Sequence, residues 1–235
     1  MIKSYHIAIL GCMSHTPSKG IGIMPQTIWI ARHGNRLDFV NPEWFNNAER
    51  RYDPPLSEDG LIQAQQLGQR LISSGIVHIF ASPFLRTIQT ANQVAEALDL
   101  PIKIEKGLSE WLNPEWMTGM PETHPQELLQ DRYPRIDWTY TSSIVPEYPE
   151  NQAEVNRRTD QTVKKLIADY SEDILLVGHG ASVVAATRSL VGDRAIVNAS
   201  LCCLVQLVSH DSGWKMILNG DTSHLSQTET VIRFN

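Results

Sequence analysis

The first residues in the chain whose types suggest chemistry are Arg32-His33-Gly34, which follow an apolar run, Thr27 to Ala31. The run is rich in β-branched and aromatic residues, which predicts a buried strand that ends where the polar residues begin. An imidazole can attack phosphorus, and a guanidinium beside it can hold phosphate oxygens through two parallel hydrogen bonds. The tripeptide therefore indicates a phosphoryl-transfer site, although a short polar motif of this kind also arises by chance on protein surfaces.

Three more candidates follow further along the chain. Arg86 lies just after a second predicted strand, where a helix opens, and adds another guanidinium. His179 lies between Gly178 and Gly180 at the end of an apolar strand, and these glycines would let the backbone approach a ligand. Glu110 ends a short strand-like stretch beside an aromatic residue and has the chemistry of a general acid. Taken singly, Arg86 could instead form a surface ion pair, and His179 could be a core histidine whose hydrogen bonds are satisfied. Glu110 could face solvent.

These four blocks, in this order and at strand ends, resemble the histidine phosphatase superfamily from about residue 26 to the C-terminus. The resemblance implies that His33 is the nucleophile and becomes a phosphohistidine. It also implies that Arg32, Arg86 and His179 form the phosphate pocket and that Glu110 protonates the leaving oxygen. We therefore expect a phosphomonoester hydrolase with no cofactor and no metal, since guanidinium groups can neutralise the transferring phosphoryl group.

Arg36, three residues after the motif histidine, narrows the resemblance. The motif with this arginine resembles the branch that includes the suppressor-of-T-cell-receptor-signalling and ecdysteroid-phosphate phosphatases. In that branch the arginine also contacts phosphate. The stretches 110–111 and 148–150 look like that branch too. A loop arginine can equally bridge to Asp38 or Glu43, so this alternative stays open.

Two other functions stay open as alternatives. Phosphoglycerate mutases of the same superfamily usually carry a small polar residue and an asparagine soon after the motif, where this chain has Asn35 and Arg36. A mutase would also need a second phosphate site, for which the sequence offers no evident basic set. A non-catalytic phospho-ligand module would tolerate loss of the nucleophile or acid, whereas this chain keeps His33 and Glu110. A phosphatase is therefore the favoured function.

Composition and net charge narrow the classes of molecule that the chain is expected to bind. The chain has 235 residues, of which 42% are hydrophobic, enough for one sizeable domain, and its formal net charge of −6 argues against nucleic acid. No apolar run approaches the roughly 20 residues of a membrane span. Cys12, Cys202 and Cys203 form no metal-binding spacing and suggest no disulfide framework, which fits a reducing cytoplasm. We expect a phosphorylated small molecule or phosphoprotein as substrate, and a homodimer is left open.

Alternation of β-rich runs with helical stripes predicts a sheet covered on both faces. With the resemblance, this implies an α/β fold, a phosphoglycerate-mutase-like three-layer α/β/α sandwich with a mostly parallel central sheet. The carboxyl ends of such strands are where ligands bind, and Arg32, His33 and His179 fall there. We expect strands near 27–31, 76–81, 102–105, 173–178, 202–208 and 214–218, and helices near 58–73, 84–98, 152–169 and 181–191.

Residues 1–23 carry no periodic pattern. The stretch 7–12 faintly resembles a lipoprotein cleavage site, but it is shorter than the roughly 7 to 15 apolar residues of a signal core, and only Lys3 precedes it. We expect either that residues 1–23 are a poorly ordered, dispensable leader or that the natural chain starts at Met24. The histidine phosphatase domain is then expected to span 24–235.

The least regular region, 112–151, is rich in aromatic residues and prolines, with a short helix expected near 125–131. Long irregular segments inside a domain are often functional lids. We expect this segment, with Trp44 and Trp116, to wall a leaving-group pocket that favours flat or aromatic phosphoesters. The alternative, aromatic packing that only anchors a long loop, has equal weight.

Overall fold

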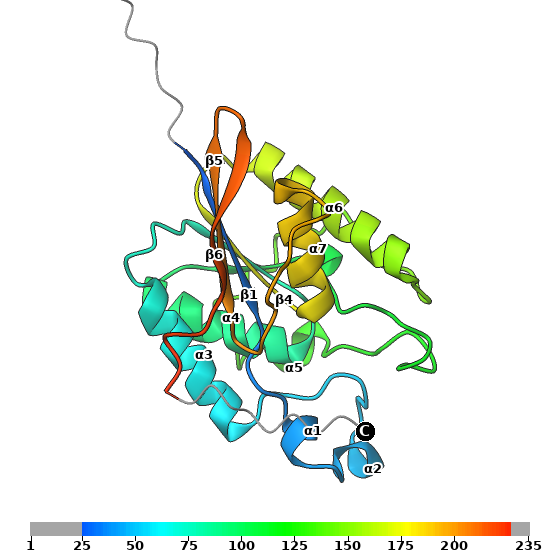
Figure 1. Cartoon of the computed structure of the whole chain (residues 1–235). Helices are drawn as coiled ribbons and strands as arrows, with labels where there is room; N and C mark the ends of the chain where they lie inside the picture. Colours follow the sequence, from blue (N-terminus) through cyan, green and yellow to red (C-terminus); the bar gives the residue numbers. More distant parts are fainter. Residues whose placement is uncertain (1–24, 227–235) are drawn as a thin grey trace, which may run out of the picture.

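One six-stranded sheet forms the centre of the computed structural model, which describes residues 25–226 (Figure 1). Its strands are β1 (Thr27–Arg32), β2 (His78–Ala81), β3 (Ile102–Ile104), β4 (Ile174–Gly178), β5 (Leu204–His210) and β6 (Gly213–Asp221). They lie in the order β3-β2-β4-β1-β5-β6. Pairing is parallel from β3 through β1, and β5 then pairs antiparallel with both β1 and β6. The predicted leader and Met24 lie outside the described residues.

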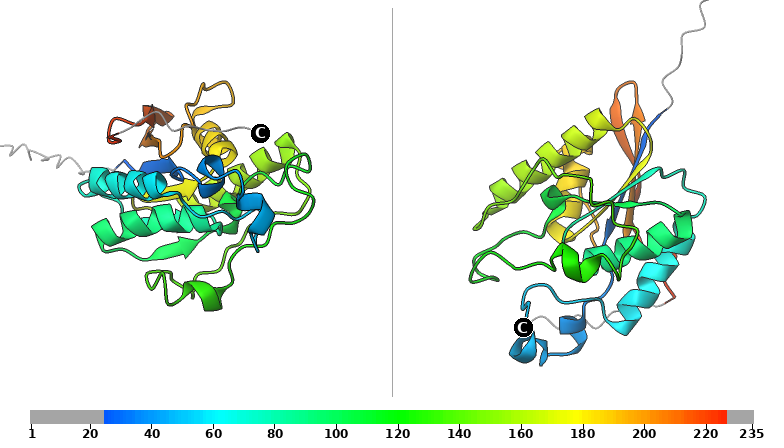
Figure 2. Two further views of the ribbon diagram at one scale, coloured as in Figure 1. Left: turned by 90° about the horizontal axis from the view of Figure 1, so that it is seen from below. Right: turned by 180° about the vertical axis from the view of Figure 1, so that it is seen from behind.

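Helices cover both faces of this sheet, as Figure 2 shows. The long ones are α3 (Glu58–Leu71), α4 (Leu85–Leu98), α6 (Gln152–Asp169) and α7 (Gly180–Val191). Trp29 and Ala31 of β1 lie in the hydrophobic cluster with α3 and α4. Ile28 and Ile30, which alternate with them, lie in the cluster with α6 and α7. A strand buried on both faces reads as a continuous apolar run, and the predicted three-layer, mostly parallel α/β fold is confirmed.

Local signals fix several helix ends. The Ser57 side chain accepts a hydrogen bond from the Gly60 amide at 3.3 Å, which caps the start of α3. Asn151 and Glu154 form a capping box at the start of α6. The sequence missed three elements of a single turn, α1 (Leu37–Val40), α2 (Trp44–Asn47) and the 3₁₀ turn η1 (Lys106–Leu108), because one turn is too short to show a helical period.

The irregular segment 112–151 contains the short helix α5 (Gln126–Leu129), inside the range expected for it. Leu129, Tyr133 and Ile136 are buried in the same cluster as α3 and α4. Leu112 and Met117 form a smaller buried cluster with Phe84. Much of the segment is therefore packed against the domain, and its exposed apolar side chains include Trp116, Met120, Trp138 and Val145.

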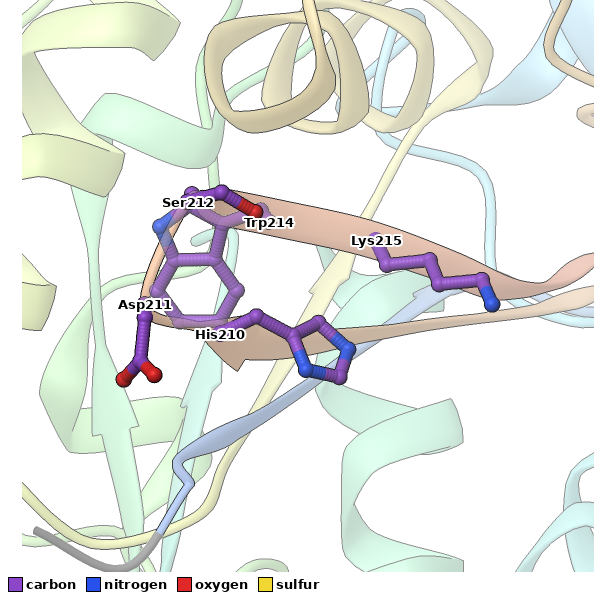
Figure 3. A pocket seen from close by; sticks show the side chains of 6 residues that line it. His210, Asp211, Ser212, Trp214 and Lys215 are labelled. Carbon is purple, nitrogen blue, oxygen red and sulfur yellow. The ribbon is translucent and has the colours of Figure 1, made fainter.

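A shallow hollow lies beside the turn between β5 and β6, lined by His210, Asp211, Ser212, Gly213, Trp214 and Lys215 (Figure 3). Thr27, the first residue of β1, pairs with Val208, so this turn lies beyond the amino-terminal end of β1. The residues predicted to do chemistry follow the opposite end. Among the described residues, no helix is long and apolar enough to cross a membrane.

Candidate active site

The pairing of β1 with β4 brings the two motif histidines together. Arg32 is in register with Gly178, and the His33 amide donates to the Gly178 carbonyl at 3.0 Å. His33 and His179, the next residue on each strand, are fully buried, and their ring centroids lie 5.3 Å apart. The structure thus places at one sheet edge two residues that are 146 positions apart in the sequence.

His33 has one ring nitrogen fixed and one free. Its Nδ1 lies 2.7 Å from the carbonyl oxygen of Gly34, which can only accept, so Nδ1 carries the proton. The other nitrogen, Nε2, has no hydrogen-bond partner among the described residues. Burial and then the nearby charge of Arg86 hold the pKa of His33 well below its usual range. The side chain is therefore a neutral imidazole with an available lone pair on Nε2, as a nucleophile needs.

His179 is held from two sides. Its Nε2 lies 2.8 Å from the Ser82 hydroxyl, and its Nδ1 accepts from Arg86 Nη2 at 3.2 Å. Burial lowers the pKa of His179 to about 4, so the ring is neutral at physiological pH. Sequence reasoning assigned no role to Ser82. Its place after a strand was readable, since it follows β2 as His179 follows β4, but the pairing of these two strands was not.

Glu110 follows η1 and reaches the same cluster. Its Oε2 lies 3.4 Å from Arg86 Nη2 and 3.3 Å from His179 Nδ1. Burial raises the pKa of Glu110, but the neighbouring His179, Arg86 and His33 outweigh burial and hold that pKa well below its usual range. Because both histidine rings are neutral, Arg86 is the cation in contact with the carboxylate that keeps it ionised. The free site therefore holds an ionised carboxylate, whereas the sequence argument requires a neutral acid as the ester bond breaks. A proton has to reach Glu110 when the substrate binds.

Arg86 connects these groups from the first turn of α4. Its side chain is 1% exposed, and burial lowers its pKa to about 10, which leaves it charged at neutral pH. Asp53 lies 3.9 Å from Arg86 Nη1, and its other contacts are with the Leu85 amide at 2.7 Å and His124 Nδ1 at 2.9 Å. This fully buried aspartate fixes the start of α4 beside the site. No sequence pattern indicated Asp53, because it lies in an irregular loop.

Arg32 and Arg36 differ in their contacts. Arg32 donates from Nη1 to the Ala199 carbonyl at 2.7 Å. Arg36 forms a two-pronged ion pair with Asp38, in which Nε donates to Oδ1 at 2.8 Å, and its guanidinium lies over the Phe39 ring. The bridge to Asp38 that the sequence left open is therefore formed. The charge of Arg36 still lowers the pKa of His33, so it lies close to the site.

Three buried nitrogens of this cluster lack a hydrogen-bond partner among the described residues: Arg32 Nε, His33 Nε2 and Arg86 Nε. A buried donor left unpaired costs about 1 to 3 kcal/mol, and two of these belong to cations. A tetrahedral oxyanion would pair with such donors and present its central atom to Nε2. The ligand atoms of His33, Glu110 and His179 lie within 4.8 Å of one another, a spacing that can hold a metal ion, but the surrounding guanidinium groups oppose a cation.

The glycines beside the motif histidines make room for protein atoms. A Cβ on Gly178 would lie 2.4 Å from the Ser182 hydroxyl, and one on Gly34 would lie 2.6 Å from the Gly60 carbonyl oxygen. A Cβ on Gly180 would be in ordinary contact with Arg32, 3.5 Å from its guanidinium carbon. The absence of a side chain at Gly178 therefore makes room for the Ser182 hydroxyl, and the expected approach of a ligand to this backbone stays a prediction.

The two tryptophans predicted to line the site have different surroundings. Trp116 is 58% exposed and packs edge-on against Trp111, the neighbour of Glu110, with centroids 5.1 Å apart. Trp44 lies on α2, where its indole donates to the Arg51 carbonyl at 3.3 Å. Within the described residues, no hydrogen bond or ring contact joins Trp44 to the histidine cluster. The structure therefore places Trp116 against Trp111, the sequence neighbour of Glu110, and Trp44 against the backbone of Arg51.

A comparison with protein families agrees with this geometry. The description "Histidine phosphatase superfamily (branch 1)" matches residues 28–222, which includes every residue of the cluster. The chain belongs to the histidine phosphatase superfamily. The resemblance that the sequence motifs carried is therefore confirmed.

Relatives within the superfamily differ in function. The chain is 32% identical over 180 residues to the transcription factor tau 55 kDa subunit of Saccharomyces cerevisiae, covering 71% of this chain and 41% of that protein. It is 31% identical over 217 residues to a probable phosphoglycerate mutase GpmB of Yersinia pestis, covering 84% and 94% of the two chains. The chain spans less than half the length of several other curated relatives.

Among solved structures, the ecdysone phosphate phosphatase of Bombyx mori in complex with tungstate matches with a TM-score of 0.72 at 21% identity. The match covers 89% of this chain and 98% of that one. At this identity the match supports the fold and not the substrate. The histidine phosphatase fold predicted from sequence is thus confirmed by an independent structure.

Proposed function

We propose that this chain is a metal-independent phosphomonoester hydrolase that acts through a phosphohistidine on His33. The observation that carries the proposal is the free, unprotonated Nε2 of His33 beside buried guanidinium groups. That combination suits a neutral nucleophile attacking a phosphate whose oxygens are held by cations. The substrate class is a phosphorylated small molecule or phosphoprotein. Cys202 and Cys203 are free and buried, which fits a reducing compartment.

In the first step, the lone pair of His33 Nε2 forms a bond to phosphorus while the bond from phosphorus to the leaving oxygen breaks. Arg32 and Arg86 neutralise the charge on the non-bridging oxygens, and Nδ1–H of His33 stays on the Gly34 carbonyl as the ring becomes charged. Glu110, once protonated, gives its proton to the leaving oxygen, which departs as an alcohol or phenol. The products are the free alcohol and phosphohistidine.

In the second step, water attacks phosphohistidine. Glu110, now ionised, takes a proton from the water, the bond from nitrogen to phosphorus breaks, and His33 is regenerated with inorganic phosphate. The Glu110 side chain is 13% exposed, whereas both motif histidines are fully buried, so solvent reaches this cluster on the Glu110 side. The lowered pKa of Glu110 suits this basic role.

The pKa directions predict an acid-shifted pH profile. His33 stays neutral well below pH 6.5, so nucleophilic attack survives mild acid. Because free Glu110 is ionised, the proton for the leaving group enters with the monoanionic phosphate, whose second pKa is about 6. We expect kcat/KM to be highest in mild acid and to fall tenfold per pH unit once the substrate becomes a dianion. A kcat/KM profile that rises through pH 6 to 8 would contradict this proton route.

Trp116 provides the test of the leaving-group pocket. Aromatic pairs contribute about 0.5 to 1.5 kcal/mol, so Trp116→Ala should raise KM for aryl phosphates about 2-fold to 13-fold and leave KM for small alkyl phosphates nearly unchanged. Trp44→Ala tests the other predicted wall residue in the same assay. Trp138→Ala, which removes a partly exposed tryptophan from the same segment, is the control. Equal effects on aryl and alkyl phosphates would remove the specificity claim.

Phosphate release from a small aryl phosphate in the presence of EDTA tests the function itself. We expect turnover that survives the chelator, and a protein-bound phosphoryl group that can be trapped by acid-free denaturation during turnover. The relative among probable phosphoglycerate mutases makes phosphate transfer the second candidate. In that case phosphate moves between positions of a phosphoglycerate without release. Binding of phosphate esters with neither reaction would indicate a non-catalytic module.

A further inference from the structure

A buried ion pair lies behind Glu110, away from the groups that hold phosphate in the proposed function. Arg158 on α6 and Glu150 just before it are each 5% exposed. Their contact is two-pronged: Arg158 Nε donates to Glu150 Oε1 at 2.6 Å and Nη2 donates to Oε2 at 2.7 Å. Neither residue was a candidate for catalysis in the sequence, and neither touches His33, Arg86 or His179 through a described hydrogen bond.

The remaining guanidinium donors all bind the backbone that carries Glu110. Arg158 Nη1 donates to the carbonyls of Gly107 and Ser109 at 2.9 and 3.1 Å, and Nη2 donates to the Glu110 carbonyl at 3.1 Å. With the two bonds to Glu150, the arginine makes five hydrogen bonds. One planar group therefore fixes three carbonyls within four consecutive residues.

Glu150 fixes the other side of the same segment. Its Oε2 accepts from the Leu112 amide at 3.2 Å, and its own amide donates to the Leu112 carbonyl at 2.9 Å. The Trp111 indole donates to the Glu150 carbonyl at 2.8 Å. Glu110 is thus held from the residues before and after it.

The carboxylate of Glu110 is held more loosely than its backbone. Its contacts with Arg86 and His179 are 3.4 and 3.3 Å long, and of these two groups Arg86 carries the charge. The charge of Arg158 is balanced by Glu150 at hydrogen-bond distance. Arg158 therefore acts on Glu110 through position.

We infer that Arg158, oriented by Glu150, is a positioning residue that sets where the Glu110 carboxyl meets the leaving oxygen. The inference rests on the proposed function, since it concerns proton transfer to the leaving group. Misplacing a catalytic group by about 1 Å can cost about 100-fold in rate. A lysine has one point charge in place of the planar fork and cannot satisfy these five acceptor positions together.

The experiment compares Arg158→Lys with Arg157→Lys, which alters the exposed neighbour on the same helix. Both are assayed on 4-nitrophenyl phosphate, whose leaving group needs little protonation, and on phenyl phosphate, whose leaving group needs more. We expect Arg158→Lys to lower kcat/KM about 10-fold to 100-fold on phenyl phosphate and at most about 3-fold on 4-nitrophenyl phosphate. Arg157→Lys should match wild type on both.

Equal losses on the two substrates, or no loss in a folded Arg158→Lys protein, would overturn the inference while leaving the hydrolase intact. No turnover by wild type would overturn the proposed function, and the inference with it. If Arg158→Lys does not fold, Glu150→Gln carries the same test, because an amide keeps an acceptor for Leu112 and removes one for Arg158. The same leaving-group dependence is expected, with a smaller effect.

Discussion

His33→Ala is expected to reduce phosphate release by about 10⁴-fold or more, because the substitution removes the atom that forms the covalent intermediate. Nucleophiles that act as a unit with their surroundings show losses of up to about 10⁶-fold in other hydrolases. The arginines would still bind phosphate, so KM or a competitive Ki for inorganic phosphate should change little. Steady-state release from 4-nitrophenyl phosphate, followed with EDTA present, measures the loss.

His210→Ala is the matched control, since it removes an exposed histidine at the end of β5, next to the turn into β6 and at the far end of the sheet. Circular dichroism melting shows whether the His33 variant is folded. Residual activity above about 1% in the folded variant, or an acid-labile phosphoryl group still trapped on it, would exclude His33 as the nucleophile. If the wild-type protein is fully active without EDTA and inactive with it, the reaction depends on a metal.

The sequence predicts the strands and helices well where an apolar run or a helical stripe is long. Each predicted strand and each long helix overlaps an observed one, because apolar runs and helical stripes of this length are set by burial. The neighbours of each strand were not predictable. That β4 lies between β2 and β1 depends on contacts between distant segments, and this placement is what joins Ser82 to His179.

The site was predictable as a set of residue types and not as a set of bonds. Motif positions indicated His33 and His179, but the carbonyl that fixes the His33 tautomer and the charges that keep Glu110 ionised depend on distances. Asp53 and Arg158 were missed because their roles arise from loop and helix surfaces that meet only in the folded chain. Arg36 shows the converse, since its local partner Asp38 was readable two residues away.

Glu110→Gln is the second substitution with a large expected effect, and it separates the two chemical steps. Loss of a general acid or base lowers rates by about 10² to 10⁴-fold. On phenyl phosphate, kcat/KM should fall by this amount, because the leaving oxygen is no longer protonated. On 4-nitrophenyl phosphate the first step needs little acid, so kcat/KM should fall far less.

The second step still lacks its base, so phosphohistidine should accumulate in this variant. Rapid mixing with 4-nitrophenyl phosphate should then give a burst of nitrophenol equal to the enzyme concentration, followed by turnover at least about 100-fold slower than wild type. Glu115→Gln, which alters an exposed glutamate five residues away, should give neither effect. A burst requires His33 to be phosphorylated and Glu110 to act afterwards as the base. A folded Glu110→Gln protein with no burst and equal losses on both substrates would assign the proton transfers to another group.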